Sequence, residues 1–247
     1  MPDRSRVERS TQDRSTEKEQ ALGLVTVDAA GMLFDMDGVL VSSIASAERC
    51  WKQWARHYGI ANWEQVTIPH GVRAEDIVRH LAPGVDVAEG LLRIETMEIA
   101  DVDDIIVLPG ARALLQSLPL ERWAIVTSAT DPLLAARLRA ARLPQPERLI
   151  SANMVTRGKP DPQPYVMGAA RLGRDGAGVP PQQCLVFEDA PNGVQAGVAA
   201  GARVVAVLGT TPEQTLRDAG ATWVVRSLES VTAVVAGDQL KVAIDAL

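Results

Sequence analysis

The chain has 247 residues, of which 47% are hydrophobic and 23% are charged, and its formal net charge is −6. This length and apolar content are enough for one large α/β domain, or for one domain that carries an insertion. The basic residues are scattered along an acidic chain, without the basic patch of proteins that bind nucleic acid. We therefore expect no nucleic-acid partner.

The two cysteines, Cys50 and Cys184, have neither the number nor the spacing of a disulfide framework or a zinc site. They are typical of a reducing compartment. No apolar run is long enough to span a membrane, and residues 1–20 lack the apolar core of a signal peptide. These features predict a cytoplasmic protein with no membrane partner, and we expect a monomer or a weak dimer.

Residues 1–20 are rich in charges of both signs and almost free of apolar side chains, so we predict a disordered tail there. The next stretch becomes apolar and β-like, and a first core strand is predicted from about Gly31 to Asp35. Residues 44–107 then show the helical spacing of apolar side chains without a strand signal. We interpret this segment as a helical insertion.

From residue 108 onward, segments with helical periodicity alternate with short apolar segments typical of strands. The predicted strands are RWAIVTSAT, RLISANM, CLVFED and RVVAVLG. Strands and helices in alternation imply right-handed βαβ crossovers and a parallel sheet. The predicted fold class is therefore α/β, with a doubly wound parallel sheet (a Rossmann-like core) that the helical insertion interrupts.

The stretch MLFDMDGVLVSS, residues 32–43, ends its apolar run with two carboxylates, Asp35 and Asp37. One interpretation is a turn, because Asp37-Gly38 between apolar runs is a common signal for the tip of a β-hairpin. The other is a ligand site, because open parallel sheets bind ligands at the carboxyl ends of their strands. This stretch alone favours neither interpretation.

Further polar side chains stand at the ends of predicted strands or in the loops that follow them. The complete set is Asp35, Asp37, Thr127, Ser128, Lys159, Glu188 and Asp189. In a doubly wound sheet the ends of neighbouring strands meet at one crevice. Two acidic pairs, a lysine and two hydroxyl groups are the side chains required for phosphoryl transfer assisted by a hard divalent cation.

Each of these side chains has a role that its chemistry permits. Asp35 can attack phosphorus and form an aspartyl-phosphate, while Asp37 can protonate the leaving oxygen and later take a proton from the attacking water. Thr127, Ser128 and Lys159 can hold the phosphoryl oxygens and balance their charge. The predicted Mg²⁺ site takes its protein ligands from Asp35, Asp37 (with a backbone carbonyl near it), Glu188 (through water) and Asp189.

Four motifs in order, DMDGVL, VTS, GKPDPQPY and FEDAPNG, resemble those of the haloacid dehalogenase-like hydrolase superfamily. The resemblance covers about residues 31–235. The helical insertion is similar in place and size to the helical cap of the phosphatase and phosphomutase branch of that superfamily. The resemblance therefore implies a catalytic core over residues 21–43 and 108–247, and a cap over residues 44–107.

Several stretches, among them PHGVRAEDIV and ISANMVTRGKPDPQPY, resemble the small-sugar and glycerol-phosphate phosphatases, including the 2-deoxyglucose-6-phosphate phosphatases. This resemblance implies a magnesium-dependent phosphatase that acts on a small sugar or polyol phosphate ester. It also favours substrate contacts from His70, Arg73 and Asp76, where the residues alone indicate a solvated helix end. Trp51, Trp54 and Trp63 could line a substrate pocket, but aromatic side chains at helical spacing are typical of packing residues, and we interpret them as such.

Two other functions stay open on the sequence. A hexose-phosphate phosphomutase would return the phosphoryl group from Asp35 to a sugar hydroxyl instead of to water. A non-enzymatic binding module would hold a phosphate ligand without chemistry, but the complete set of catalytic side chains argues against it. A dehalogenase would leave Asp37 without a role, because no leaving oxygen needs a proton in that reaction.

Overall fold

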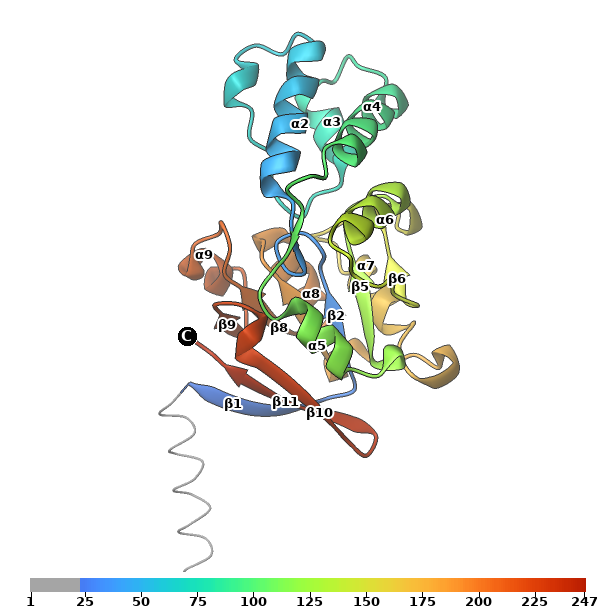
Figure 1. Ribbon diagram of the computed structural model, residues 1–247, viewed down its shortest axis with the longest axis vertical. Coiled ribbons are helices and arrows are strands. Elements are labelled where there is room, and N and C mark those ends of the chain that lie inside the picture. Colours follow the sequence, from blue (N-terminus) through green and yellow to red (C-terminus); the bar gives the residue numbers. More distant parts are fainter. Residues whose placement is uncertain (1–22) are drawn as a thin grey trace, which may run out of the picture.

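The computed structural model describes residues 23–247, so the predicted tail over residues 1–20 lies outside the described residues. At its centre is a six-stranded sheet in which all neighbouring strands are parallel, in the order β6-β5-β2-β7-β8-β9 (Figure 1). Its strands are β2 (Gly31–Phe34), β5 (Trp123–Val126), β6 (Leu149–Ile150), β7 (Cys184–Glu188), β8 (Arg203–Val207) and β9 (Trp223–Val225). This sheet confirms the predicted α/β fold class.

Helices cover both faces of this sheet, as a doubly wound fold requires. They are α5 (Ala111–Ser117), α6 (Asp131–Ala140), α7 (Gln163–Ala169), α8 (Pro191–Ala199) and α9 (Glu213–Asp218). Successive side chains of β2 point to opposite faces, as in any strand. Met32 and Phe34 pack in one hydrophobic cluster with α5 and α6, whereas Leu33 packs in a second cluster with α7, α8 and α9.

A second sheet of three antiparallel strands packs against α5 and extends the first hydrophobic cluster. Its strands, in the order β1-β11-β10, are β1 (Leu24–Ala29), β11 (Gln239–Asp245) and β10 (Val231–Ala236). β1 corresponds to the β-like stretch predicted from the sequence, whereas the β10–β11 hairpin was not predicted. Its turn is Gly237-Asp238, and Gly237 has a φ of 62°, a left-handed conformation that suits a two-residue hairpin loop.

The inserted segment forms helices above the carboxyl edge of the parallel sheet (Figure 1). These helices are α2 (Ile44–His57), α3 (Ala74–Leu81) and α4 (Val87–Ala100). They share a hydrophobic cluster of their own, in which Trp54 is fully buried and its indole N–H donates to the carbonyl of Gly90 at 2.8 Å. Trp51 is buried in the same cluster and the partly buried Trp63 packs against it, so the three tryptophans pack as predicted.

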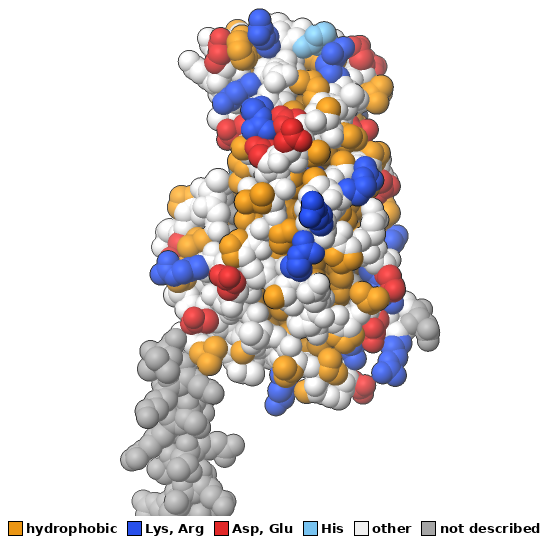
Figure 2. Space-filling view, in the orientation of Figure 1, with side chains coloured by type: hydrophobic (Ala, Val, Ile, Leu, Met, Phe, Trp, Pro, Cys, Tyr) orange, Lys and Arg blue, Asp and Glu red, His pale blue; other side chains and the backbone are white. Residues whose placement is uncertain are grey.

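The chain passes between core and insertion through two short strands, β3 (Val41–Ser42) and β4 (Ile106–Val107), which pair antiparallel. Single turns of 3₁₀ helix complete the fold at Trp63–Gln65, Leu120–Arg122, Ala152–Met154, Arg174–Gly176, Pro181–Gln183 and Leu228–Ser230. Figure 2 shows acidic and basic side chains interspersed over one face of the molecule. None of the helices between residues 23 and 247 has both the length and the apolar character needed to cross a membrane.

Candidate active site

Three buried carboxylates meet at the carboxyl edge of the parallel sheet. Asp35 directly follows β2, while Glu188 ends the neighbouring strand β7 and Asp189 follows it. One carboxylate oxygen from each residue lies within 4.8 Å of the other two, and each residue is at most 3% exposed. The structure therefore brings together three of the four predicted metal ligands.

A buried lysine lies against two of these carboxylates. The Nζ of Lys159 donates to Asp35 Oδ1 at 2.7 Å, to Glu188 Oε1 at 2.6 Å and to the carbonyl of Val126 at 3.1 Å. Burial by itself lowers the pKa of Lys159, but the charges of Asp35 and Glu188 raise it more, so the net shift is upward. The lysine therefore keeps a positive charge beside Asp35.

The carboxylates carry more negative charge than this lysine compensates. Burial raises the pKa of Asp35 to about 7, although the charge of Lys159 acts in the opposite direction. Burial, followed by the charge of Glu188, also raises the pKa of Asp189 well above its ordinary value. Asp189 Oδ1 is buried and has no hydrogen-bond partner among the described residues. A divalent cation that prefers oxygen ligands fits this group, because it would bind the free oxygen and favour the ionised carboxylates.

Close packing around the carboxylates explains the glycine that follows Asp37. Gly38 has a φ of +84°, and a Cβ at this position would lie 2.0 Å from Asp189 Oδ2. Gly193 of α8 has a similar role, since its Cβ would lie 1.9 Å from Glu188. β2, the strand before Asp37, has a parallel neighbour on each edge, β5 and β7, so it cannot pair antiparallel with the residues that follow Gly38. The interpretation of Asp37-Gly38 as a hairpin tip is therefore wrong.

A pocket lies between this edge of the sheet and the cap. From the core it is lined by Asp35, Asp37, Thr127, Ser128, Thr130 and Arg137, among others. The polar side chains that the insertion contributes are His70, Glu95 and Glu98, beside apolar side chains such as Trp51, Ile77, Leu91 and Ile94. Apolar walls with a few convergent polar groups are typical of a site for a small molecule.

The two hydroxyl residues after β5 both line this pocket but have different partners. Thr127 Oγ1 accepts a hydrogen bond from the backbone N–H of Ala129 at 3.0 Å. Ser128 Oγ donates to the carbonyl of Gly71 in the insertion at 2.6 Å. Ser128 therefore connects the core to the cap loop next to His70.

Asp37 lies on the pocket wall but outside the group of three carboxylates. Its Oδ1 accepts a hydrogen bond from the hydroxyl of Ser43 at 2.5 Å, and its Oδ2 accepts one from Arg137 at 2.8 Å. Arg137 also donates to Glu98 Oε1 at 3.2 Å. These hydrogen bonds hold the carboxylate of Asp37 at the junction of core and cap, and its predicted contact with the metal stays a prediction.

Of the three cap residues predicted to contact substrate, His70 lines the pocket and the other two do not. Arg73 Nε donates to Asp76 Oδ2 at 2.9 Å, and Arg73 Nη1 donates to the carbonyl of Thr156 at 3.2 Å. A Cβ on Gly158 would lie 2.8 Å from Arg73 Nε, so the arginine packs directly on the loop that carries the buried lysine. In this structure Arg73 joins the cap to that loop.

Polar side chains at the site for which the sequence predicts no role include Glu95, Glu98, Arg137 and Tyr165. The hydroxyl of Tyr165 is fully buried and donates to Glu188 Oε1 at 2.5 Å. A signal for the others is a charge on an otherwise apolar helix face. Glu98 follows Ile94 at helical spacing, and Arg137 follows the buried leucines of α6 in the same way.

Comparisons with known proteins agree with this geometry. The family model of the haloacid dehalogenase-like hydrolases matches residues 30–201. Hexitol phosphatase A from Escherichia coli is 43% identical to this chain over 207 residues, which cover 82% of this chain and 93% of that protein. 2-Deoxyglucose-6-phosphate phosphatase 2 from Saccharomyces cerevisiae is 34% identical over 220 residues, which cover 82% of this chain and 89% of that protein.

Among solved structures, that of a hydrolase from Pseudomonas syringae has a TM-score of 0.67 at 26% sequence identity. The match covers 80% of this chain and 93% of the other. This chain thus shares its fold with a known hydrolase, and in this chain a helical insertion lies above the carboxyl edge of the parallel sheet. The chain belongs to the haloacid dehalogenase-like hydrolase family.

Proposed function

We propose that the protein is a phosphatase that hydrolyses a small sugar or polyol phosphate monoester through an aspartyl-phosphate intermediate. The observation that carries this proposal is the position of Asp35. It stands at a buried strand end beside Lys159 and faces the pocket under the cap. The similarity to a hexitol phosphatase and to a 2-deoxyglucose-6-phosphate phosphatase supports the substrate class.

The proposed reaction has two displacements at phosphorus. In the first, a carboxylate oxygen of Asp35 attacks phosphorus, the bond to the leaving oxygen breaks, and Asp37 gives that oxygen a proton. In the second, Asp37 takes a proton from water, the water oxygen attacks phosphorus, and the bond to Asp35 breaks to release inorganic phosphate. We expect Thr127, Ser128 and Lys159 to hold the phosphoryl oxygens during both steps.

We propose Mg²⁺ as the cation at the three carboxylates. Asp35 and Asp189 would be its direct ligands and Glu188 would bind it through water, which suits a hard cation that keeps several water molecules. When bound, the cation would neutralise charge on the phosphoryl oxygens and help to orient the phosphoryl group.

Removal of divalent cations with EDTA is expected to abolish phosphate release, and added Mg²⁺ is expected to restore it. Ca²⁺ is expected to inhibit, because its larger radius and looser coordination disturb the in-line geometry at Asp35. The measurement is phosphate release by the chelated and dialysed protein during titration with each cation. Full activity after exhaustive chelation would contradict the metal site.

The charges of the pocket favour a neutral, hydroxylated leaving group. Glu95 and Glu98 of α4 line the pocket, and Arg137 is already paired with Asp37 and Glu98. Glu95 Oε1 accepts a hydrogen bond from the neutral hydroxyl of Thr130. Carboxylates accept hydrogen bonds from sugar or polyol hydroxyls, whereas they repel a carboxylate on the substrate.

A panel of phosphate esters assayed with Mg²⁺ tests this function. We expect kcat/KM for a hexitol phosphate, 2-deoxyglucose 6-phosphate or glycerol phosphate to exceed that for 3-phosphoglycerate by about 100-fold, because like charges side by side are costly. A preference for the carboxylated ester would contradict the proposed substrate class. Transfer of phosphate to another sugar hydroxyl would identify a phosphomutase, and phosphate binding without turnover would identify a binding module.

Contacts from the cap complete the proposal. His70 lines the pocket and can donate a hydrogen bond to a substrate oxygen. Arg73 and Asp76 form an ion pair with each other, so a substrate contact from either one requires a different position of the cap. The enzyme that we propose is a cytoplasmic monomer or weak dimer.

A further inference from the structure

Helix α6 carries a charged side chain into the junction between core and cap. The side chain of Arg137 is only 6% exposed, and it lines the pocket together with Asp37 and Glu98. Figure 1 shows α6 of the core below α4 of the cap, and the two helices are in contact. Arg137 therefore lies where the cap rests on the core.

The guanidinium group joins two carboxylates from different parts of the protein. Its Nη1 donates to Asp37 Oδ2 at 2.8 Å and its Nη2 donates to Glu98 Oε1 at 3.2 Å. The other oxygen of Asp37 accepts from Ser43, which immediately precedes α2. Both oxygens of Asp37 are therefore held, one by a helix of the core and one at the entry to the cap.

An arginine suits this position better than a lysine. Its planar group can direct separate N–H bonds at two acceptors, whereas a lysine presents a single point charge. Burying such an ion pair adds little net stability, because the cost of removing the charges from water offsets their attraction. The buried arginine is therefore better explained by what it does to Asp37 than by its contribution to the free energy of folding.

A second contact joins α4 and α6. Thr130, which immediately precedes α6, donates to Glu95 of α4. Glu95 and Glu98 are three residues apart, so they lie on one face of that helix. The position of α4 on α6 is thus set at two points, and the point formed by Arg137 leads directly to Asp37.

We propose that Arg137 is a positioning residue, which directs the carboxylate of Asp37 toward the leaving oxygen. Through Glu98, Arg137 also makes this orientation depend on the position of the cap on the core. The inference rests on the proposed function, in which Asp37 is the acid and base. Arg137 transfers no proton and touches no reacting atom. Without it, Asp37 can rotate away from the pocket, so proton transfer slows while the attack by Asp35 is preserved.

The choice of leaving group separates this role from a purely structural one. A sugar or polyol oxygen must receive a proton from Asp37 as its bond to phosphorus breaks. The 2,4-dinitrophenolate ion is a weak base and leaves without a proton. Loss of Arg137 should therefore slow the first displacement for a polyol ester much more than for the dinitrophenyl ester.

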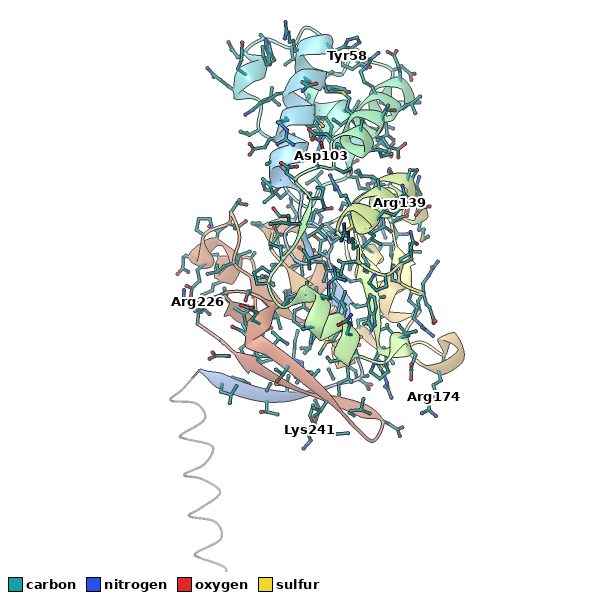
Figure 3. All side chains as sticks on the ribbon, in the orientation of Figure 1. Tyr58, Asp103, Arg139, Arg174, Arg226 and Lys241 are labelled. Atoms are coloured by element: carbon teal, nitrogen blue, oxygen red, sulfur yellow. The ribbon has the colours of Figure 1, made fainter. Side chains whose placement is uncertain are left out.

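The test compares Arg137→Gln with the wild type in single-turnover assays with Mg²⁺. The substrates are the best sugar or polyol phosphate of the panel and 2,4-dinitrophenyl phosphate. We expect release of the sugar or polyol to slow by about 100-fold or more, and release of dinitrophenolate by less than about 5-fold. The matched control is Arg139→Gln on the same helix, where the side chain is exposed (Figure 3), and both rates should stay at the wild-type level.

Equal losses on the two esters would show that Arg137 is structural, and unchanged rates would overturn its role altogether. Glu98→Gln tests the connection to the cap, and it replaces Arg137→Gln if circular dichroism shows that variant to be unfolded. It should give a smaller loss with the same dependence on the leaving group, and any other pattern would overturn the connection. A wild-type protein that releases phosphate from no ester would contradict the proposed function itself, and this role with it.

Discussion

Asp35→Asn is expected to abolish turnover while the protein stays folded. An amide oxygen is a poor nucleophile, so no aspartyl-phosphate forms, and loss of a covalent nucleophile costs about 10⁴- to 10⁶-fold in kcat. The amide has nearly the shape of the carboxylate, and its oxygen can still accept the hydrogen bond that Lys159 donates at 2.7 Å in the wild type. The measurement is phosphate release from the preferred ester at saturating Mg²⁺.

Asp28→Asn is the matched control for this change, because Asp28 is exposed on β1, away from the pocket. It should leave kcat unchanged. Circular dichroism verifies the fold of both variants, and mass spectrometry verifies that the new amide has not hydrolysed back to a carboxylate. A folded, intact Asp35→Asn variant that turns over at the wild-type rate would exclude the covalent mechanism.

The cluster of three carboxylates, Asp35, Glu188 and Asp189, could be predicted because each residue has a defined position at the end of a strand. An apolar stretch that ends in a carboxylate places that group at the edge of a sheet, as at Asp35 and Glu188. The alternation of strands and helices predicts a parallel sheet, and β2 and β7 are neighbours in it. The side chains at their ends must then lie close together, whatever the details of packing.

The partners of Asp37 could not be predicted in the same way. Arg137 is 100 residues from Asp37 in the sequence and 39 residues from Glu98. Helical periodicity indicates which face of α6 is buried, but it contains no information on what lies across that face. Only the packing of α4 on α6 brings Glu98 to the pair formed by Asp37 and Arg137.

The β10–β11 hairpin and the contact of Arg73 with the core differ in whether the local sequence indicates them. Apolar residues alternate along β11 after Gly237-Asp238, and Gly-Asp is a two-residue sequence typical of hairpin turns, so the sequence contains information that predicts the hairpin. The contact of Arg73 with the carbonyl of Thr156 has no such local signal. It depends on how the cap loop packs on the loop after β6, which is a property of the tertiary structure.

Lys159→Met is expected to destabilise the protein as well as to remove its activity. Without Nζ, the carboxylates of Asp35 and Glu188 share a buried space with no cation from the protein. Removal of one partner from a buried ion pair costs about 3–5 kcal/mol. Methionine is a flexible side chain of similar length, so the change opens no large cavity. The free energy of unfolding is measured with urea in the presence of EDTA.

The size of this destabilisation should depend on pH. Burial raises the pKa of Asp35 from an ordinary value of 3.8 to about 7 even though the charge of Lys159 opposes the shift, so removal of that charge raises the pKa further. A carboxyl group whose pKa is raised by folding stabilises the folded protein at a pH below the pKa that the group has in the unfolded chain. This contribution is lost as the pH rises through the pKa that the group has in the folded protein.

At pH 5, therefore, Asp35 is mostly protonated in both proteins, and the two free energies of unfolding should differ least. At pH 8 the wild type has an ionised Asp35 paired with Lys159. In the variant Asp35 must either stay protonated at this pH or be ionised without a cationic partner beside Glu188, and both states are unfavourable. The variant should fall further below the wild type at pH 8 than at pH 5. Lys241→Met, at an exposed position on β11 (Figure 3), should show no such change. An equal difference at both pH values would mean that Lys159 stabilises the site by packing and not by its charge.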